Sequence, residues 1–262
     1  MTNAALHVAR TGLDAQNTKM QVIANNLANV NTTGFKKDRA DFQALAYQQL
    51  IAAGAASDSE NKFATGLSLG TGVSLAGTSR IDTQGTLTQT GGSLDLAIEG
   101  NGYFQVQRPD GLIGYTRDGH FSRTAEGTIV NSDGLPLVPQ IQVPDGVVSI
   151  TIGNDGTVSA VEAGQSAPTE LGKIELASFA NASGLQSVGG NVLLETAASG
   201  APQIGTAGLD GRGTIKQGAL EASNVNIVEE LVDMIETQRA YEVNSKMIKS
   251  TDEMLQYVNQ QL

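Results

Sequence analysis

The side chains that most often carry catalysis are scarce in this sequence. Cysteine is absent, which excludes thiol catalysis, disulfide bonds and cysteine-ligated metals. The two histidines, His7 and His120, lie far apart, and neither has a second ligand at the spacing of a metal site. No nucleophile motif of the Gly-x-Ser-x-Gly type accompanies Asp118-Gly119-His120. We therefore predict no metal, no cofactor and no catalytic residue.

Aspartate–glycine pairs recur through the middle of the chain, as aspartates do in calcium-binding loops. None of the pairs has the D-x-[DN]-x-[DN]-G spacing with a final glutamate, so turn formation accounts for them. The glycine-rich stretches at 70–72 and 208–213 match neither the dinucleotide-binding fingerprint nor a P-loop. Paired carboxylates of the glycosidase kind stay open as an alternative, because two such residues can be far apart in sequence.

The net charge and the hydropathy of the chain limit its partners. The 262 residues carry a net charge of −11, which disfavours binding to nucleic acid and to anionic membranes. No stretch approaches the roughly 18 apolar residues of a spanning helix, so we expect no membrane insertion. Residues 1–30 lack the apolar centre of a signal peptide, since polar residues such as Gln16 and Lys19 interrupt it. We expect a protein that stays in the cytosol or leaves it without a cleaved signal.

Glycine and proline divide the chain into three segments. Of the 31 glycines, only Gly12 and Gly34 lie within residues 1–45, and none lies within 219–262. All six prolines lie in the middle segment. Because both residue types disfavour helices, we predict a helix at each end and a middle that is rich in turns.

The C-terminal segment carries apolar residues at seven-residue intervals, which is the spacing of a helix that packs against another helix. These residues are Leu220, Ile227, Met234, Tyr241, Ile248, Leu255 and Leu262, and the residues that widen the stripe include Leu231, Val232, Ile235, Met247 and Met254. Asn226 is a candidate N-cap, with Glu229 as its capping-box partner. The alternative is a helix that packs only on its own domain, but so long a stripe favours a partner of equal length.

The N-terminal segment offers such a partner, because Leu6, Leu13, Met20 and Leu27 also recur every seven residues. Its other faces carry amides more than charges, which favours contacts between helices or the wall of a water-filled bore over a merely solvated face. The first 45 residues hold five basic and three acidic side chains (+2), whereas residues 219–262 hold three basic and eight acidic (−5). The two ends should therefore attract each other weakly. We predict that the helix ends near Gly34, in the left-handed conformation of a C-cap.

The middle segment has the pattern of short strands. Leu94, Leu96 and Ile98 alternate with polar residues, and Asn101-Gly102 is a hairpin signal. The expected fold class is α+β, in which long N- and C-terminal helices pair as a coiled coil and an antiparallel β-rich domain is inserted between them. The expected segments are 1–34 for the first helix, 35–93 for a connector, 94–205 for the β-rich domain, 206–226 for a return connector and 227–262 for the second helix.

Two motifs at opposite ends of the chain resemble the signature of bacterial flagellar rod and hook proteins. The first is ANNLANVNTTGFK, residues 24–36, and the second runs from SNVN at 223–226 through QRAYE at 238–242. Segments 70–73, 97–100 and 115–119 make the resemblance greatest to the distal-rod members of that family. The motif residues are Asn25, Asn26, Asn29, Gly34, Phe35, Asn224, Asn226, Arg239 and Tyr241.

The resemblance implies a structural subunit and no enzymatic activity. In this family the terminal helices form an inner tube, the β domain faces outward, and subunits leave the cytosol through the flagellum's own export apparatus without cleavage. The implied assembly seam, called the predicted seam below, consists of Leu6, Leu13, Met20, Leu27, Ile227, Met234, Tyr241, Ile248 and Leu255. Such a rod crosses the periplasm, transmits torque to the hook and carries exported subunits in its bore.

The resemblance also implies the partners. They are copies of the chain itself, proximal rod proteins, the hook protein, the P-ring and L-ring proteins and the export apparatus. It further implies that residues 46–66 become ordered between neighbouring subunits and stiffen the rod. Two alternatives stay open, namely a proximal rod or hook protein of the same family and a secreted β-rich binding module or enzyme.

Overall fold

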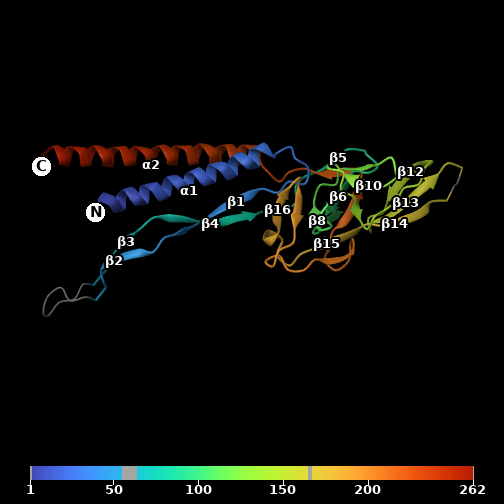
Figure 1. Cartoon of the computed structure of the whole chain (residues 1–262), viewed down its shortest axis with the longest axis horizontal. Coiled ribbons are helices and arrows are strands. Elements are labelled where there is room, and N and C mark those ends of the chain that lie inside the picture. Colours follow the sequence, from blue (N-terminus) through green and yellow to red (C-terminus); the bar gives the residue numbers. More distant parts are fainter. Residues whose placement is uncertain (1, 55–63, 165–166, 262) are drawn as a thin grey trace. The chain divides into compact units, whose positions relative to one another are not determined.

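The computed structural model describes residues 2–54, 64–164 and 167–261, which form two α-helices and the strands between them (Figure 1). Helix α1 is Thr2–Ala28 and helix α2 is Ile227–Gln261. The chain divides into two compact units. Unit 1 contains the residues up to Leu27, Asp38–Ser79 and the residues from Asn226 onward, whereas unit 2 contains Ala28–Lys37 and Arg80–Val225.

The expected fold class is wrong, because the chain is mainly β rather than α+β. Strands hold 38% of the residues and helices 23%, and α1 and α2 are the only α-helices among the described residues. The reason is the composition of the middle, where frequent glycines end each strand after a few residues and let the chain reverse. Within the chain, α2 leaves apolar side chains such as Val232 and Ile235 about half exposed.

Unit 1 contains both helices and two pairs of strands. Strand β1 (Asp38–Ala44) pairs with β4 (Val73–Arg80), and β2 (Tyr47–Ile51) pairs antiparallel with β3 (Leu67–Gly70). Strand β2 covers part of the segment 46–66, for which we expected order only in the assembly. Residues 55–63 of that segment lie outside the described residues.

Unit 2 contains the remaining strands and the hydrophobic core. A five-stranded sheet has the order β11 (Leu137–Val138), β7 (Phe104–Gln107), β8 (Ile113–Thr116), β17 (Val192–Leu194) and β16 (Gln186–Gly189). A three-stranded sheet has the order β12 (Val147–Ile152), β13 (Thr157–Glu162) and β14 (Thr169–Lys173). The edge-to-face pair of Phe104 and Phe121 lies in the core among aliphatic side chains.

Four further strand pairs complete unit 2. They are β15 (Glu175–Ser178) with β18 (Gln203–Thr206), β19 (Thr214–Gln217) with β6 (Leu96–Glu99), β20 (Ala219–Glu221) with β5 (Leu87–Gln89), and β10 (Ile129–Asn131) with β9 (Phe121–Arg123). A single 3-10 turn, η1, is described at Ala182–Gly184.

The ends of the helices confirm the predicted N-cap and correct the predicted end of the first helix. Asn226 is the N-cap of α2, because its Oδ1 accepts the N–H of Val228 at 3.1 Å. Helix α1 ends at Ala28 and not near Gly34, since the N–H of Thr32 turns back to the carbonyl of Asn29 (3.1 Å). Leu220 of the seven-residue repeat lies in β20, and α2 begins at Ile227, the residue where the second helix was expected to begin.

Candidate functional site

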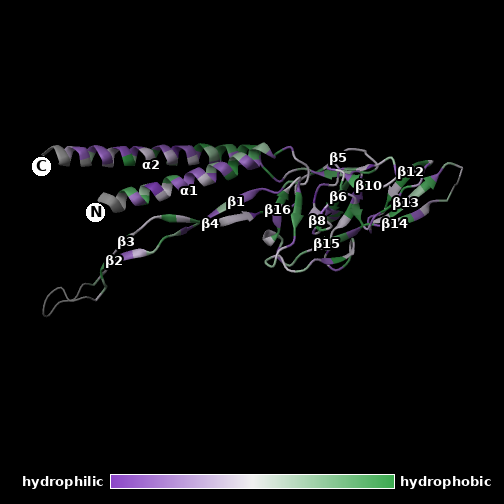
Figure 2. Ribbon diagram, in the orientation of Figure 1, coloured by the Kyte–Doolittle hydropathy of each residue, from purple (hydrophilic) through white to green (hydrophobic). Residues whose placement is uncertain are grey.

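The first half of α2 carries an exposed apolar surface formed by Val228, Leu231, Val232 and Ile235. These four side chains have the i, i+3, i+4, i+7 spacing of one helix face, and their exposed fractions run from 42% to 69%. Figure 2 shows hydrophobic residues recurring along α2. We call this set the α2 apolar surface. Because it has the pattern of a packed helix face, it is the candidate assembly surface of the chain.

The predicted seam is only partly covered within the chain. Its α1 members, together with Met234 and Ile248, are half-buried, whereas Ile227 and Tyr241 are exposed by 47% and 41%. The side chain of Leu255 lies outside the described residues. These side chains retain surface that a neighbouring copy could cover, so the seam stays a prediction.

Sequence reasoning missed a polar line along α2. Among the described side chains of α2, only those of Glu230 and Thr237 are buried, and both are polar. Asn244 lies seven residues further on, and a Cβ added at Gly12 would be 3.1 Å from its Nδ2 atom. The same seven-residue spacing that revealed the apolar stripe could have revealed this line.

The family-motif residues lie in different surroundings. Asn26 is buried and bonds to Asp38 and Glu230, as described below. Asn29 accepts the hydroxyl of Thr32 at 3.2 Å, and Phe35 is half-buried. Asn25 on α1 and Arg239 and Tyr241 on α2 are exposed. The motif is therefore divided between buried positions that hold the chain and exposed positions on the helices.

A buried ion cluster in unit 2 joins three distant parts of the sequence. Glu221, which is 2% exposed, accepts Lys36 Nζ at 2.5 Å and Arg117 Nη1 at 3.2 Å. The N–H of Gly85 donates to the same carboxylate at 2.9 Å. We call Lys36, Arg117 and Glu221 the Glu221 cluster. Two cations and a backbone N–H already bond to this one buried carboxylate, so the cluster has the character of a structural tie.

The surroundings of the Glu221 cluster show how its charges are tolerated. Burial lowers the pKa of Lys36, although the bond to Glu221 acts in the opposite direction. Lys36 also donates to the carbonyl of Thr83 at 2.8 Å, and Arg117 donates to the carbonyl of Gly100 at 2.7 Å. The guanidinium of Arg117 lies 5.3 Å from the ring centroid of Tyr103. Hydrogen bonds and the aromatic ring thus replace the water that the two cations lose.

Gly34 and Asn224 fix the backbone beside this cluster. The N–H of Gly34 donates to the carbonyl of Glu221 at 2.8 Å, and Gly34 has a φ of +68°. Asn224 Oδ1 accepts the N–H of Lys37 at 2.8 Å, while its Nδ2 donates to the carbonyl of Ile81 at 2.8 Å. Gly34 therefore fixes the backbone of unit 2 through its own N–H, and Asn224 does so through its side-chain amide.

The two histidines make separate, local contacts. His7 Nδ1 lies 3.2 Å from the carbonyl of Thr71, and His120 Nδ1 lies 2.8 Å from Asp95 Oδ1. In the part of the chain that the structure describes, no three His, Cys, Asp or Glu residues are placed to hold a metal ion, and neither helix is apolar enough to span a membrane. The histidines thus contribute ordinary hydrogen bonds.

The pair of Asp95 and His120 predicts a pH effect. Burial opposes ionisation of Asp95, but hydrogen bonds from Thr90 (2.5 Å) and His120 outweigh it and lower its pKa below 3.8. A lowered carboxyl pKa stabilises the fold above about pH 4, and this stabilisation is lost as the pH falls through the lowered pKa. The natural chain should lose unfolding free energy between pH 6 and pH 3. We expect Thr90→Val to lose less over the same range, as measured by urea titration. An unchanged pH dependence would contradict this assignment.

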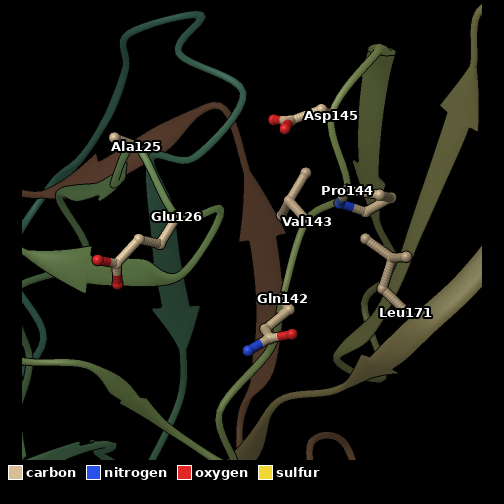
Figure 3. A pocket seen from close by; sticks show the side chains of 7 residues that line it. All are labelled: Ala125, Glu126, Gln142, Val143, Pro144, Asp145 and Leu171. Atoms are coloured by element: carbon tan, nitrogen blue, oxygen red, sulfur yellow. The ribbon is translucent and has the colours of Figure 1, made fainter.

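A shallow pocket of about 410 Å³ in unit 2 is lined by residues on either side of Val143. Figure 3 shows the side chains of Glu126 and Asp145 apart from each other, with Val143 and Pro144 near Asp145. Asp145 forms an ion pair with Arg123, whose Nη2 lies 2.6 Å from Asp145 Oδ1. The pocket does not bring two carboxylates together, so it gives the glycosidase alternative no support.

Comparison with known proteins matches three parts of the chain to family models. Residues 6–36 match the flagella basal body rod protein model, residues 97–160 the flagellar hook protein FlgE/F/G D1 domain, and residues 216–261 the flagellar basal body rod FlgEFG protein C-terminal model. The flagellar basal-body rod protein FlgG of Buchnera aphidicola subsp. Acyrthosiphon pisum is 51% identical, over 98% of both chains. The chain belongs to the flagellar basal-body rod protein family.

Other relatives of this rod protein agree with that assignment. FlgG of Caulobacter vibrioides is 46% identical over 98% of both chains, and FlgG of Bacillus subtilis is 38% identical over 96% of both. The Glu221 cluster of the rod protein takes one residue from each matched part, namely Lys36, Arg117 and Glu221. The three matched parts are thus joined by one buried cluster.

Proposed function

We propose that this chain is the structural subunit of the distal flagellar rod, a hollow helical shaft that crosses the periplasm. In this role it transmits motor torque to the hook and carries exported subunits through its bore. The support comes from full-length relatives named FlgG, a flagellar basal-body rod protein, together with the exposed α2 apolar surface. The family is structural, and the proposal includes no enzymatic activity.

The choice within the family rests on two relatives from one organism. The chain is 46% identical to FlgG of Caulobacter vibrioides but 37% identical to its FlgF. This difference favours a rod protein of the FlgG kind over one of the FlgF kind. The proposed partners are copies of the chain, proximal rod proteins, the hook protein, the P-ring and L-ring proteins and the export apparatus. Export would use that apparatus and no cleaved signal.

The α2 apolar surface gives a physical reason for self-assembly. Fully burying an aliphatic side chain stabilises by about 1.5–3 kcal/mol, and the four side chains here still expose roughly half of their surface. A neighbouring copy that covers these side chains would add the rest of this burial free energy at every contact along a rod. The predicted seam, from Ile227 to Ile248 on α2, would complete its burial in the same step.

The test is a charge on the α2 apolar surface. Ile235→Asp is expected to abolish polymer formation, because a buried aspartate would cost at least about 2 kcal/mol at each repeated contact. The matched control is Gln238→Asp, which adds the same charge at an exposed polar position of α2. Sedimentation at rising concentration and electron microscopy measure assembly, and a motility assay in a rod-deficient bacterium measures function. Straight tubes from Ile235→Asp would contradict the proposal.

A further inference from the structure

Asn26 and Glu230 form a buried polar contact inside unit 1. Asn26 is 2% exposed and Glu230 is 4% exposed, while neighbouring apolar side chains on α2 such as Leu231 are 42% exposed. Burying a polar pair requires the loss of its hydration, which an apolar pair would not suffer. The position therefore calls for a reason other than stability alone.

The amide of Asn26 is bonded on both of its polar atoms. Its Nδ2 donates to the carbonyl of Asp38 at 2.9 Å and to Glu230 Oε2 at 3.3 Å, and its Oδ1 accepts the N–H of Asp38 at 3.0 Å. One side chain on α1 thus holds the first residue of β1 and the first turn of α2. A shift of either helix by one residue would rotate the partner by about 100° and break these bonds.

Direction distinguishes this contact from apolar packing. Apolar contacts are non-directional, so an apolar stripe that repeats every seven residues packs similarly after a shift of seven. A buried polar residue at such a position is known to specify register at some expense of stability. The hydroxyl of Thr237 donates within its own helix, to the carbonyl of Asp233 at 2.6 Å, so its proton is not used to bond another element.

We propose that Asn26 is the positioning residue that sets the register of α1 against α2 and against the start of β1. Glu230 is its partner on α2, and the backbone of Asp38 is its partner on β1. The inference concerns contacts within one chain, so it stands or falls independently of the proposed function.

The absence of cysteine allows a direct measurement of register. Gly12→Cys with Asn244→Cys places two thiols where a Cβ at Gly12 would already be 3.1 Å from the Asn244 side chain. Pairing Gly12→Cys instead with Thr237→Cys or Thr251→Cys reports a shift of seven residues in either direction. Mild oxidation of the full chain at low concentration, followed by peptide mapping, gives the yield of each intramolecular disulfide.

We expect the pair at 12 and 244 to dominate in the otherwise natural chain. Asn26→Leu should reduce that preference at least about five-fold, because it leaves the carboxylate of Glu230 without the amide donor. Equal yields for the three pairs in the natural chain, or an unchanged preference in Asn26→Leu, would overturn the proposal.

A reciprocal exchange separates positioning from general damage. Asn26→Asp sets two carboxylates against each other and should remove the preference, whereas adding Glu230→Gln restores a donor between the two side chains and should recover part of it, because the carbonyl of Asp38 still lacks its donor. Glu230→Gln alone keeps an oxygen that can accept from Asn26 and should retain the natural pattern. A loss in Asn26→Asp of which Glu230→Gln repairs no measurable part would also overturn the proposal.

Discussion

Replacing Glu221 with leucine is expected to lower the free energy of unfolding of unit 2 by about 3–5 kcal/mol. The substitution leaves Lys36 and Arg117 buried without their common counter-ion, and it removes the acceptor of the Gly85 N–H. A buried charge that loses its partner cannot be rehydrated without opening the structure. Glu221→Gln should have a smaller effect, because an amide oxygen keeps one acceptor in place.

The measurement is urea unfolding of the full chain followed by circular dichroism. Glu126→Leu is the matched control, since it removes an exposed glutamate of the same unit. Combining Glu221→Leu with Lys36→Met and Arg117→Met should recover part of the lost stability, because the unpaired charges then disappear. An unfolding midpoint for Glu221→Leu that matches the control would show that the Glu221 cluster contributes no stability.

Gly34→Ala is expected to destabilise unit 2 by roughly 2–4 kcal/mol. Two effects add at this position. Gly34 has a φ of +68°, which a residue with a Cβ seldom adopts, and the added Cβ would lie 2.6 Å from backbone atoms of Arg117 and Asp118. Backbone cannot rotate away as the end of a side chain can, so the neighbouring strand or the residues at 32–36 must move.

The same urea titration measures this effect. Gly77→Ala in β4 is the control, because an added Cβ there meets nothing within 4 Å. The N–H of Gly34 donates to the carbonyl of Glu221, so the variants Gly34→Ala and Glu221→Leu should couple in a double-mutant cycle. If Gly34→Ala and Gly77→Ala had the same free energy of unfolding, the added Cβ at position 34 would not clash with the backbone.

The sequence by itself determined which parts are helical and which parts turn. It also determined which family the chain resembles most. Glycine and proline act locally, so their absence from the ends and their frequency in the middle already predict helices and short strands there. The N-cap at Asn226 was predictable for the same reason, since a cap involves only neighbouring residues. The family motifs are contiguous and are therefore readable without a fold.

The expected fold class was wrong, and the coverage of the apolar stripe was not predictable, for a different reason. Periodicity says that a stripe exists on a helix, but it does not say how much of the stripe the same chain covers. Among the described side chains of α2 the buried ones are Glu230 and Thr237, while Val232 and Ile235 of the apolar stripe stay half exposed. Burial depends on what lies opposite a residue, and that is a property of the tertiary structure.

Only the tertiary structure decided which residues form the Glu221 cluster and the contact of Asn26. Lys36 and Glu221 are 185 residues apart in sequence, and Asn26 and Glu230 are 204 apart. Such pairs leave no local signal, because each residue alone is compatible with an exposed position. They form because folding brings β20 beside the residues that follow α1 and places the first turn of α2 against α1, where charges and amides deprived of water must bond to one another.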